Sequence, residues 1–585
     1  ALPVPADQVH RLLAEHYWLA GLPDKARPYA LHEAERAMRI FAFREERYYL
    51  NMAQASLPEE SPERLDLLQR MGMLSLGIYD FAEALHWLNL AKTGYQRIGQ
   101  RRRTLQVIAN LLFANWFIAC QSMPELLAEV ESTAEAVFAD PDPASRNVET
   151  LVATSLLAHY WTVHSRYARS ATWIERCFAL FEALDDPRKV PAIQLSHITR
   201  AWFKAHWHIN DFEEGIAEIR HAIDLATQYS LPDVIMIGYV TFAWMLICWG
   251  RVDEAEQVLE EAAGLEERSG TLLPSFLLGW QHFFSGDRWE QGMERLRQGI
   301  ERLDRLHVFY VAAVARVALA HLLLTRNELA EASTHLQAAQ PALASNDEYI
   351  YQMSLWWGFA RLLRIQGDLP QAQAGYDSIL KRWKTTEDTL TIMPILLDGI
   401  TFYTDTGDLV RARQWLAELE AVMEITDNSV GAAVLLEAHG RLKAAEGAPG
   451  EAIPMLREAV EAWGRLKWRY YQALASQRLA ESLLVWARKQ STNRPGAQAA
   501  REEADILLDK GLTVYEDLQI PTGIQAIQRL RSSAHLESQH KHRRTLQMRH
   551  PLESLTKRER QVLLQLEAGG TNREIASALH ISTGT

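Results

Sequence analysis

The sequence contains little cysteine and no apparent targeting segment. Only three of its 585 residues are cysteines, and they lie far apart in the chain: Cys120, Cys177 and Cys248. This number and spacing argue against a disulfide framework and against a zinc-finger pattern. We therefore expect buried thiols in a reducing compartment, the cytoplasm. The N-terminal residues also lack the basic region and apolar core of a secretory signal.

Motifs of nucleotide, metal and hydrolytic chemistry are missing as well. The sequence has no G-x-x-x-x-G-K-[ST] loop, no H-E-x-x-H and no G-x-S-x-G. The nearest approach to a metal cluster is His206 with His208 and Asp211, but residues two apart on a helix point to different faces. Paired carboxylates such as Glu213 and Glu214 are typical of a solvated helix face. We expect no enzyme, no metal site and no cofactor in this chain.

One long uncharged run is a candidate for a membrane span, VIMIGYVTFAWMLICW at residues 234–249. It falls short of the roughly 18 to 20 apolar residues that a bilayer requires. The run also occupies one position of a repeat described below. We therefore expect a buried helix of a folded array.

Negative charge dominates the chain but not its end. The net charge is −13; from Arg531 onward there are nine Lys and Arg against five Asp and Glu, whereas residues 1–530 carry 52 against 69. An acidic surface repels the phosphate backbone of nucleic acids and a basic one attracts it. The charge distribution therefore favours nucleic-acid binding by the C-terminal segment alone.

A short turn pattern recurs about every forty residues. Clear copies begin at Asn210, Gly250, Gly286, Asn327, Gly367, Gly407 and Gly447. Each turn lies between an apolar and an amphipathic stretch, which predicts a helix hairpin. Gly or Asn permits the left-handed backbone that ends the first helix, and a small residue five positions later permits close helix packing. A single hairpin cannot bury its apolar face, so the hairpins must stack.

The turn pattern G-x-x-x-x-A resembles that of tetratricopeptide repeats. The period is longer here than in those repeats, which usually measure about 34 residues. The resemblance implies an all-α superhelix, which we expect to cover residues 1–530. Arrays of this kind mostly bind other proteins.

Tryptophan is frequent, at 18 residues. Seven of these indoles lie on expected first helices: Trp202, Trp207, Trp244, Trp249, Trp280, Trp356 and Trp357. First helices usually line the concave surface, where indoles can stack on sugar rings, aromatic ligands or peptide side chains. The alternative is that they pack one hairpin on the next. Packing is the commoner role of a single indole, but we expect a few of the seven, Trp280 aside, to line an effector groove.

The repeat pattern ends after Leu530. Residues 531–551 are polar, basic and rich in Ser and His, a composition typical of a linker between folded units. A basic linker beside a DNA-binding domain could also add phosphate contacts.

Two short helices are predicted at the end of the chain. Each begins with a T-x-x-E capping box, Thr556 with Glu559 and Thr571 with Glu574. Apolar residues recur at helical spacing at Val562, Leu563, Leu566, Ile575 and Leu579. Gly569 and Gly570 end the first helix, and small Ala576 allows the close crossing of a helix-turn-helix.

The pattern L-T-x-R-E-x-x-V-L-x-L-x-A-x-G-x-x-N-x-E-I-A-x-x-L-x-I-S, which ends at Ser582, resembles the first half of the LuxR-type DNA-binding domain. In that family the recognition helix follows, starting near a T-V-K-x-H motif. Thr585 stands where this Thr would be, and the V-K-x-H is missing. The resemblance therefore implies a truncated helix-turn-helix domain over residues 552–585, without the helix that reads base edges. It places DNA-contacting positions at Thr571, Asn572, Arg573, Ser582, Thr583 and Thr585.

A LuxR-type domain behind a tetratricopeptide-like array resembles the large ATP-dependent LuxR regulators of bacteria, the group that contains the maltose-regulon activator. The resemblance implies a transcriptional regulator with DNA as a partner, a small-molecule or protein effector in the array, and self-association. ATP is implied only for an N-terminal module that this chain lacks, so we expect a fragment shortened at both ends. The alternative is a scaffold whose superhelix binds a protein partner.

Overall fold

The computed structural model describes residues 6–78, 80–118, 123–140, 146–206, 211–269, 280, 282–305, 307–344, 349–490, 495–546, 557–567, 569 and 571–579. Within these ranges the regular secondary structure is helical and contains no strand. The predicted all-α fold, a tetratricopeptide-like array of helix hairpins followed by two short helices, is confirmed.

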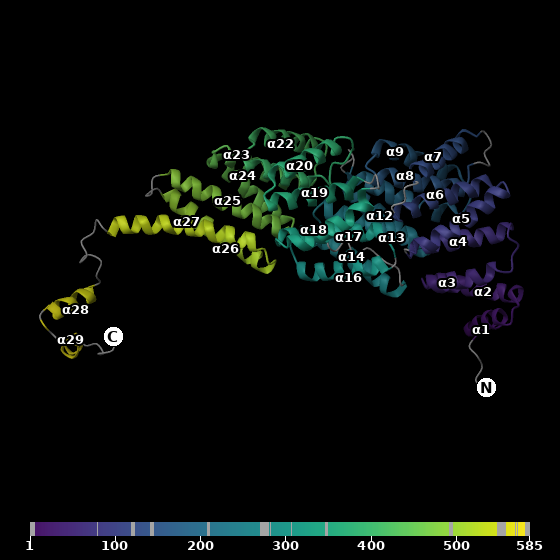
Figure 1. Ribbon diagram of the computed structural model, residues 1–585, viewed down its shortest axis with the longest axis horizontal. Coiled ribbons are helices and arrows are strands. Elements are labelled where there is room, and N and C mark those ends of the chain that lie inside the picture. Colours follow the sequence, from purple (N-terminus) through teal and green to yellow (C-terminus); the bar gives the residue numbers. More distant parts are fainter. Residues whose placement is uncertain are drawn as a thin grey trace.

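The helices of the array follow one another from the N-terminus to a long final helix (Figure 1). The first part contains α1 (Ala6–Leu19), α2 (Pro23–Arg39), α3 (Phe43–Gln54), α4 (Pro62–Gly77), α5 (Phe81–Arg97), α6 (Arg101–Ile118), α7 (Met123–Ala139), α8 (Val148–Val163), α9 (Tyr167–Ala183) and α10 (Lys189–Ala192). The middle part contains α11 (Gln194–His206), α12 (Phe212–Gln228), α13 (Pro232–Cys248), α14 (Val252–Ser269), α16 (Trp289–Arg305), α17 (Phe309–Thr325) and α18 (Leu329–Ala344).

The last part of the array contains α19 (Tyr349–Gln366), α20 (Leu369–Trp383), α21 (Met393–Thr406), α22 (Leu409–Met423), α23 (Ser429–Ala445), α24 (Pro449–Arg465), α25 (Arg469–Lys489), α26 (Pro495–Asp517) and α27 (Pro521–Leu546). Residues 531–546, in the segment predicted to be a linker, continue α27 as helix. Two short helices follow, α28 (Lys557–Glu567) and α29 (Asn572–Ala578). Figure 1 shows them apart from the array.

The turn residues have the predicted left-handed backbone. Their φ angles are +77° at Gly250, +66° at Gly286, +65° at Asn327, +86° at Gly367, +81° at Gly407 and +81° at Gly447. In two of these turns the residue after the glycine caps the second helix, because a carboxylate of Asp368 or Asp408 accepts a hydrogen bond from the backbone three residues on, at 3.2 and 3.1 Å. The G-D pair therefore ends one helix and starts the next.

The small residue five positions after the turn lies where the two helices cross. Five alanines at this position have no exposed surface: Ala255, Ala332, Ala372, Ala412 and Ala452. This confirms the predicted close approach. The hairpins share one continuous apolar core that runs from Ala14 to Ile527, so each hairpin is stabilised by its neighbours.

Contacts between distant repeats close the superhelix on itself. Thr389 Oγ1 donates to the carbonyl of His206 at 2.7 Å, and Asn428 donates to the carbonyl of Cys248 at 3.2 Å. Further along, Arg326 Nε donates to the carbonyl of Leu518 at 3.0 Å. Such pairs are separated by 180 to 219 residues. At forty residues per hairpin, one turn of the superhelix takes about five hairpins.

None of the described helices combines the length and apolar character needed to cross a bilayer. The uncharged run lies in α13, where Phe242 and Met245 are almost completely buried within the array. Cys177 is also fully buried, and burial raises the pKa of its thiol. Cys248 is half-buried, and Cys120 lies outside the described residues.

Candidate functional site

A cavity of about 410 Å³ lies between the first helices of successive hairpins. Its wall is formed by α17, α19, α21, α23 and α25, together with the junction of α26 and α27. A cavity of this size is in the range of ligand-binding pockets. As expected, the first helices supply the inner surface.

The repeat register determines which side chains reach this cavity. Arg361, Thr401 and Arg441 occupy the same position of three successive hairpins, and all three line it. A second register, four residues earlier, contributes Trp357, Leu397, Glu437 and Gln477. The charged members of this set were not predicted from the sequence. Charged residues at equivalent positions of otherwise apolar first helices are the signal that would have identified them.

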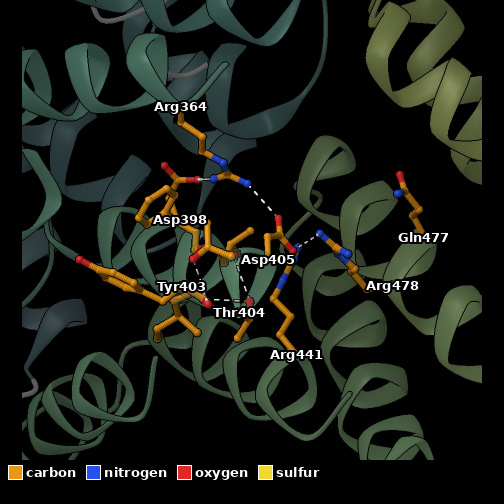
Figure 2. A network of polar contacts seen from close by, with 12 residues as sticks. Arg364, Asp398, Tyr403, Thr404, Asp405, Arg441, Gln477 and Arg478 are labelled. Atoms are coloured by element: carbon orange, nitrogen blue, oxygen red, sulfur yellow. Dashed lines mark hydrogen bonds and ion pairs between the residues drawn. The ribbon is translucent and has the colours of Figure 1, made fainter. Parts of the chain in front are cut away.

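Asp405 bridges two arginines at one side of the cavity (Figure 2). Arg364 donates to one of its carboxylate oxygens at 3.0 Å, and Arg478 donates to the other at 2.8 Å. Arg478 also pairs with Glu481 at 3.0 Å. These contacts join α19, α21 and α25 through ion pairs that lie on the inner surface of the array.

Asp398, also in the cavity wall, accepts hydrogen bonds from a second set of donors. It accepts hydrogen bonds from Trp357 Nε1 at 2.7 Å, from the Tyr376 hydroxyl at 2.6 Å and from Arg364 at 3.1 Å. Burial favours the neutral carboxyl, but the charges of Arg364 and Arg361 and these hydrogen bonds outweigh it and lower the pKa of Asp398. Asp398 is therefore an ionised carboxylate, and both of its oxygens accept hydrogen bonds from the protein itself.

Glu437 and Arg441 form a buried ion pair within α23. Their side chains are 0% and 5% exposed, and Arg441 Nε donates to Glu437 at 2.7 Å. The second carboxylate oxygen of Glu437 accepts from Trp463 Nε1 at 2.8 Å. Because a buried charge without a partner is costly, this pair fixes both side chains in the cavity wall.

Arg361 is bound differently from the other three arginines. Its guanidinium donates to His321 Nδ1 and to Thr325 Oγ1, both at 2.8 Å. The other ring nitrogen of His321 lies 3.0 Å from the carbonyl of Ser354 and can only donate to it. Burial, followed by the charge of Arg361, lowers the pKa of His321 to about 3. His321 is therefore a neutral acceptor.

Three of the candidate groove tryptophans pack against the array itself. The indole of Trp202 stacks on His206, with ring centroids 3.8 Å apart. Trp249 stacks on Phe212 at 4.2 Å and donates to the carbonyl of Ala205 at 3.1 Å. Trp356 is partly buried against the core. Trp249 therefore joins its hairpin to the preceding one, whereas the stack of Trp202 lies within α11.

Two others line cavities. Trp357 lies in the wall of the large cavity, and it also borders a second cavity of about 30 Å³ that contains Trp244 in its wall. Trp280, Phe284 and Trp468 complete the aromatic lining of this small cavity, which has room for about one water molecule. Trp207 lies outside the described residues.

Of the three metal candidates in the sequence, His206 is buried in the core. Its Nδ1 lies 2.9 Å from the carbonyl of Trp202, and burial lowers its pKa to about 3. His208 lies outside the described residues. Asp211 precedes α12, where a hydrogen bond with Glu214 raises its pKa.

Within the described part of the chain, one other group has the composition of a metal site: His10, His32 and Glu33, whose ligand atoms lie within 4.8 Å of one another. Its members come from α1 and α2, so no short motif indicates it. Glu33 already accepts a hydrogen bond from Arg36 at 2.7 Å, and we assign no metal to the group.

The two C-terminal helices show the predicted start of a helix-turn-helix. Gly569 has φ +85° at the end of α28. Thr571 and Glu574 form the predicted capping box at the start of α29, with the Thr571 backbone N–H donating to Glu574 at 2.9 Å. The hydrogen bonds from the Thr571 side chain and backbone lower the pKa of Glu574. Ile575 and Ala576 are buried, whereas Leu563 and Leu566 are exposed.

Of the expected DNA-contacting residues, Thr571 and Arg573 are described and both are exposed. Asn572 is placed at the first position of α29, but its side chain is outside the described part. Ser582, Thr583 and Thr585 also lie outside it, as does Thr556 of the first predicted capping box.

Comparisons with solved structures show loose likeness over most of the chain. The APC/C hetero-tetramer Cut9–Hcn1 is 14% identical, with 89% of this chain and 98% of that chain covered and a TM-score of 0.40. Yeast Tom70 is 12% identical, with 82% of this chain and 99% of that chain covered and a TM-score of 0.32. A Rap protein complexed with competence and sporulation factor is 13% identical, with 82% of this chain and 100% of that chain covered and a TM-score of 0.28. Likeness at this level says nothing about ligands or partners.

No curated protein matches the sequence. A family model does match the end of the chain: residues 553–585 fit the model of bacterial regulatory proteins of the luxR family, GerE. The match covers the segment that contains α28 and α29. The chain therefore carries a helical-hairpin array followed by a LuxR-family DNA-binding segment.

Proposed function

We propose that this chain belongs to a transcriptional regulator in which the LuxR-type segment binds DNA and the helical array senses an effector. The match of residues 553–585 to the luxR family carries the first part of this proposal. It is supported by the exposed Arg573 on α29 and by the basic charge of the segment after Arg531, since cations near phosphate strengthen DNA binding. The protein acts in the bacterial cytoplasm and is not an enzyme.

The sensing part rests on the cavity between the first helices. It is large enough for a small molecule, and its charged side chains are held by one another. By resemblance, we place the protein with the large ATP-dependent regulators, in which effector binding permits self-association and an ATP-binding module precedes the array.

A scaffold that binds a protein partner is the second candidate. It is favoured by the length of the array, whose continuous core extends from Ala14 to Ile527, because superhelices of stacked hairpins offer extended surfaces to other proteins.

The test is selection of bound duplexes from a random DNA library by the full-length protein encoded by the gene. We expect enrichment of one sequence motif. Arg573→Ala should weaken binding to all duplexes to a similar extent and reduce the salt dependence by about one phosphate contact. Arg413→Ala, on the outer helix α22, is the matched control. If no motif is enriched, the DNA-binding proposal fails and the scaffold function is favoured.

A further inference from the structure

The large cavity, of about 410 Å³, has a cationic side chain in its wall that the described part of the protein does not neutralise. Arg364 and Arg478 share Asp405, and Arg441 pairs with Glu437. Arg361 donates instead to the neutral acceptors His321 and Thr325. Among the residues that the structure describes, no carboxylate oxygen lies within 4.0 Å of its guanidinium.

Asp398 is a carboxylate that feels the charge of Arg361, and it already accepts hydrogen bonds from three other side chains. Arg361 contributes to lowering the pKa of Asp398, so their charges interact. However, the oxygens of Asp398 are taken by Trp357, Tyr376 and Arg364, at 2.6 to 3.1 Å. A guanidinium has five N–H donors in a planar fork that matches carboxylate and phosphate groups. Arg361 therefore keeps donors for a ligand.

The surroundings of Arg361 combine this charge with apolar surface. Its guanidinium carbon lies 5.4 Å from the ring centroid of Trp357 and 5.7 Å from that of Phe283. Leu324, Leu397 and Leu474 line the same cavity. A ligand with both an anionic group and an apolar body would satisfy the two kinds of wall at once.

We infer that this cavity binds a small organic anion whose carboxylate or phosphate pairs with Arg361 and whose apolar part packs against the leucines and aromatic rings beside it. That this anion is the effector of the regulator rests on the function proposed above.

The cavity is bordered by the start of α27, the helix that precedes the DNA-binding segment. Ile520, Thr522 and Gly523, at the start of α27, form part of its wall. The chain just before α27 is fixed to the array, because Arg326 donates to the carbonyl of Leu518 and the Tyr515 hydroxyl donates to Gln477 at 3.1 Å. A ligand in the cavity therefore contacts the beginning of the helix whose other end lies before α28.

The experiment measures binding of three small aromatic probes to the full chain by calorimetry. Benzoate carries a carboxylate, phenyl phosphate carries a phosphate, and benzamide is the neutral counterpart of benzoate. The variants are Arg361→Gln, which removes the charge, and Arg361→Lys, which keeps the charge but loses the fork. Arg413→Gln removes a charge from the outer helix α22, where Arg413 pairs with Glu446 at 2.8 Å, and is the control.

We expect at least one anion to bind the unmodified chain and the Arg413 variant, and benzamide to bind at least tenfold more weakly. Arg361→Gln should lose about tenfold or more in affinity for the anion, as expected for one charge-assisted hydrogen-bonding group, and Arg361→Lys should lie between the two. Which anion binds more tightly distinguishes a carboxylate ligand from a phosphate ligand.

Three results would overturn the inference: equal binding of benzamide and benzoate, unchanged anion binding by Arg361→Gln, or no binding of either anion to the unmodified chain. Circular dichroism spectra and melting temperatures of the variants show that loss of binding is not loss of folding. If the anions bind through Arg361 but do not alter DNA occupancy of the full-length protein, the cavity inference stands and the effector role proposed for it fails.

Discussion

Two neighbouring cavities of the array share the first helices α19, α21 and α23 but differ in the side chains that form the rest of their walls. The small cavity of about 30 Å³ is lined by Trp244, Trp280 and Trp468, whereas the large one of about 410 Å³ has four arginines in its wall. Three of these arginines pair with carboxylates, and Arg361 does not. Trp357 borders both cavities. Indoles can pack against one another until little space remains. Charged groups must keep distances set by hydrogen bonds and by their own partners, so that space for a ligand is left between them.

The composition draws attention to tryptophan, whereas the larger cavity is lined by charged residues that the composition does not single out. The frequent tryptophans stand out in the sequence, and most of those described in the first helices pack within the array or line the small cavity. The polar residues that line the large cavity are ordinary in number and are recognisable only by their repeat register. Replacing residues in each wall separates a packing role from a ligand-binding role.

Trp280→Ala should have the largest effect on stability. The side chain is 1% exposed and contacts the rings of Trp244, Phe283 and His321. We expect a loss of about 3 to 5 kcal/mol in the free energy of unfolding, measured by denaturant titration. Probe binding in the large cavity should survive in the folded fraction. A loss of less than about 1 kcal/mol would show that the small cavity is not a packing centre.

Asp398→Ala should have the second largest effect, a loss of about 3 kcal/mol in the free energy of unfolding. The substitution removes the common acceptor of Trp357, Tyr376 and Arg364 and leaves buried donors without a partner. Thermal unfolding measures the effect. Asp377→Ala is the control, since Asp377 accepts from Tyr403 at 2.6 Å outside the large cavity. An equal, small effect of both changes would contradict the central role of Asp398.

The pH dependence of the free energy of unfolding should reveal His321, the buried histidine that accepts a hydrogen bond from Arg361. The pKa of His321 is about 3 in the folded chain and about 6.5 when unfolded, so the unfolded state binds more protons between these values. Stability is therefore full above pH 6.5 and falls as the pH decreases, by about 2 kcal/mol for this histidine between pH 7 and pH 5. In His321→Gln this part of the pH dependence should disappear; parallel stability curves for the two proteins would refute it.

Tyr376→Phe should have the smallest effect on stability, a loss of about 1 kcal/mol in the free energy of unfolding, because it removes one of several donors to Asp398 while keeping the ring. The pKa of Asp398 should rise as this hydrogen bond to its ionised form is lost. Nuclear magnetic resonance titration of the carboxyl group measures this shift. An unchanged pKa would show that Arg364 and Arg361 alone keep Asp398 ionised.

Much of the local structure could be predicted. Gly407 in the turn, Ala412 five positions later and the Thr571–Glu574 capping box all behave as their residue types require. Each of these features depends on the backbone within a few residues. The repeat length added the hairpin order, because identical turns must join similar helix pairs.

Contacts between distant parts of the chain could not be predicted in this way. The bond between Thr389 and the carbonyl of His206 spans 183 residues, and no local pattern of either segment indicates the other. The same holds for Arg361, whose sequence neighbours do not show that its acceptors are His321 and Thr325 on another hairpin.

The sequence by itself determined the helix hairpins, their forty-residue order and the LuxR-type segment, since these follow from backbone geometry and from motifs with fixed spacing. Only the tertiary structure decided how many hairpins complete one superhelical turn, which charges neutralise one another and where space remains between them. These properties arise from small rotations added over many hairpins, so no single repeat contains the information. The pairing of Arg361 with neutral acceptors of the preceding hairpin is one property that depends on this packing of hairpins.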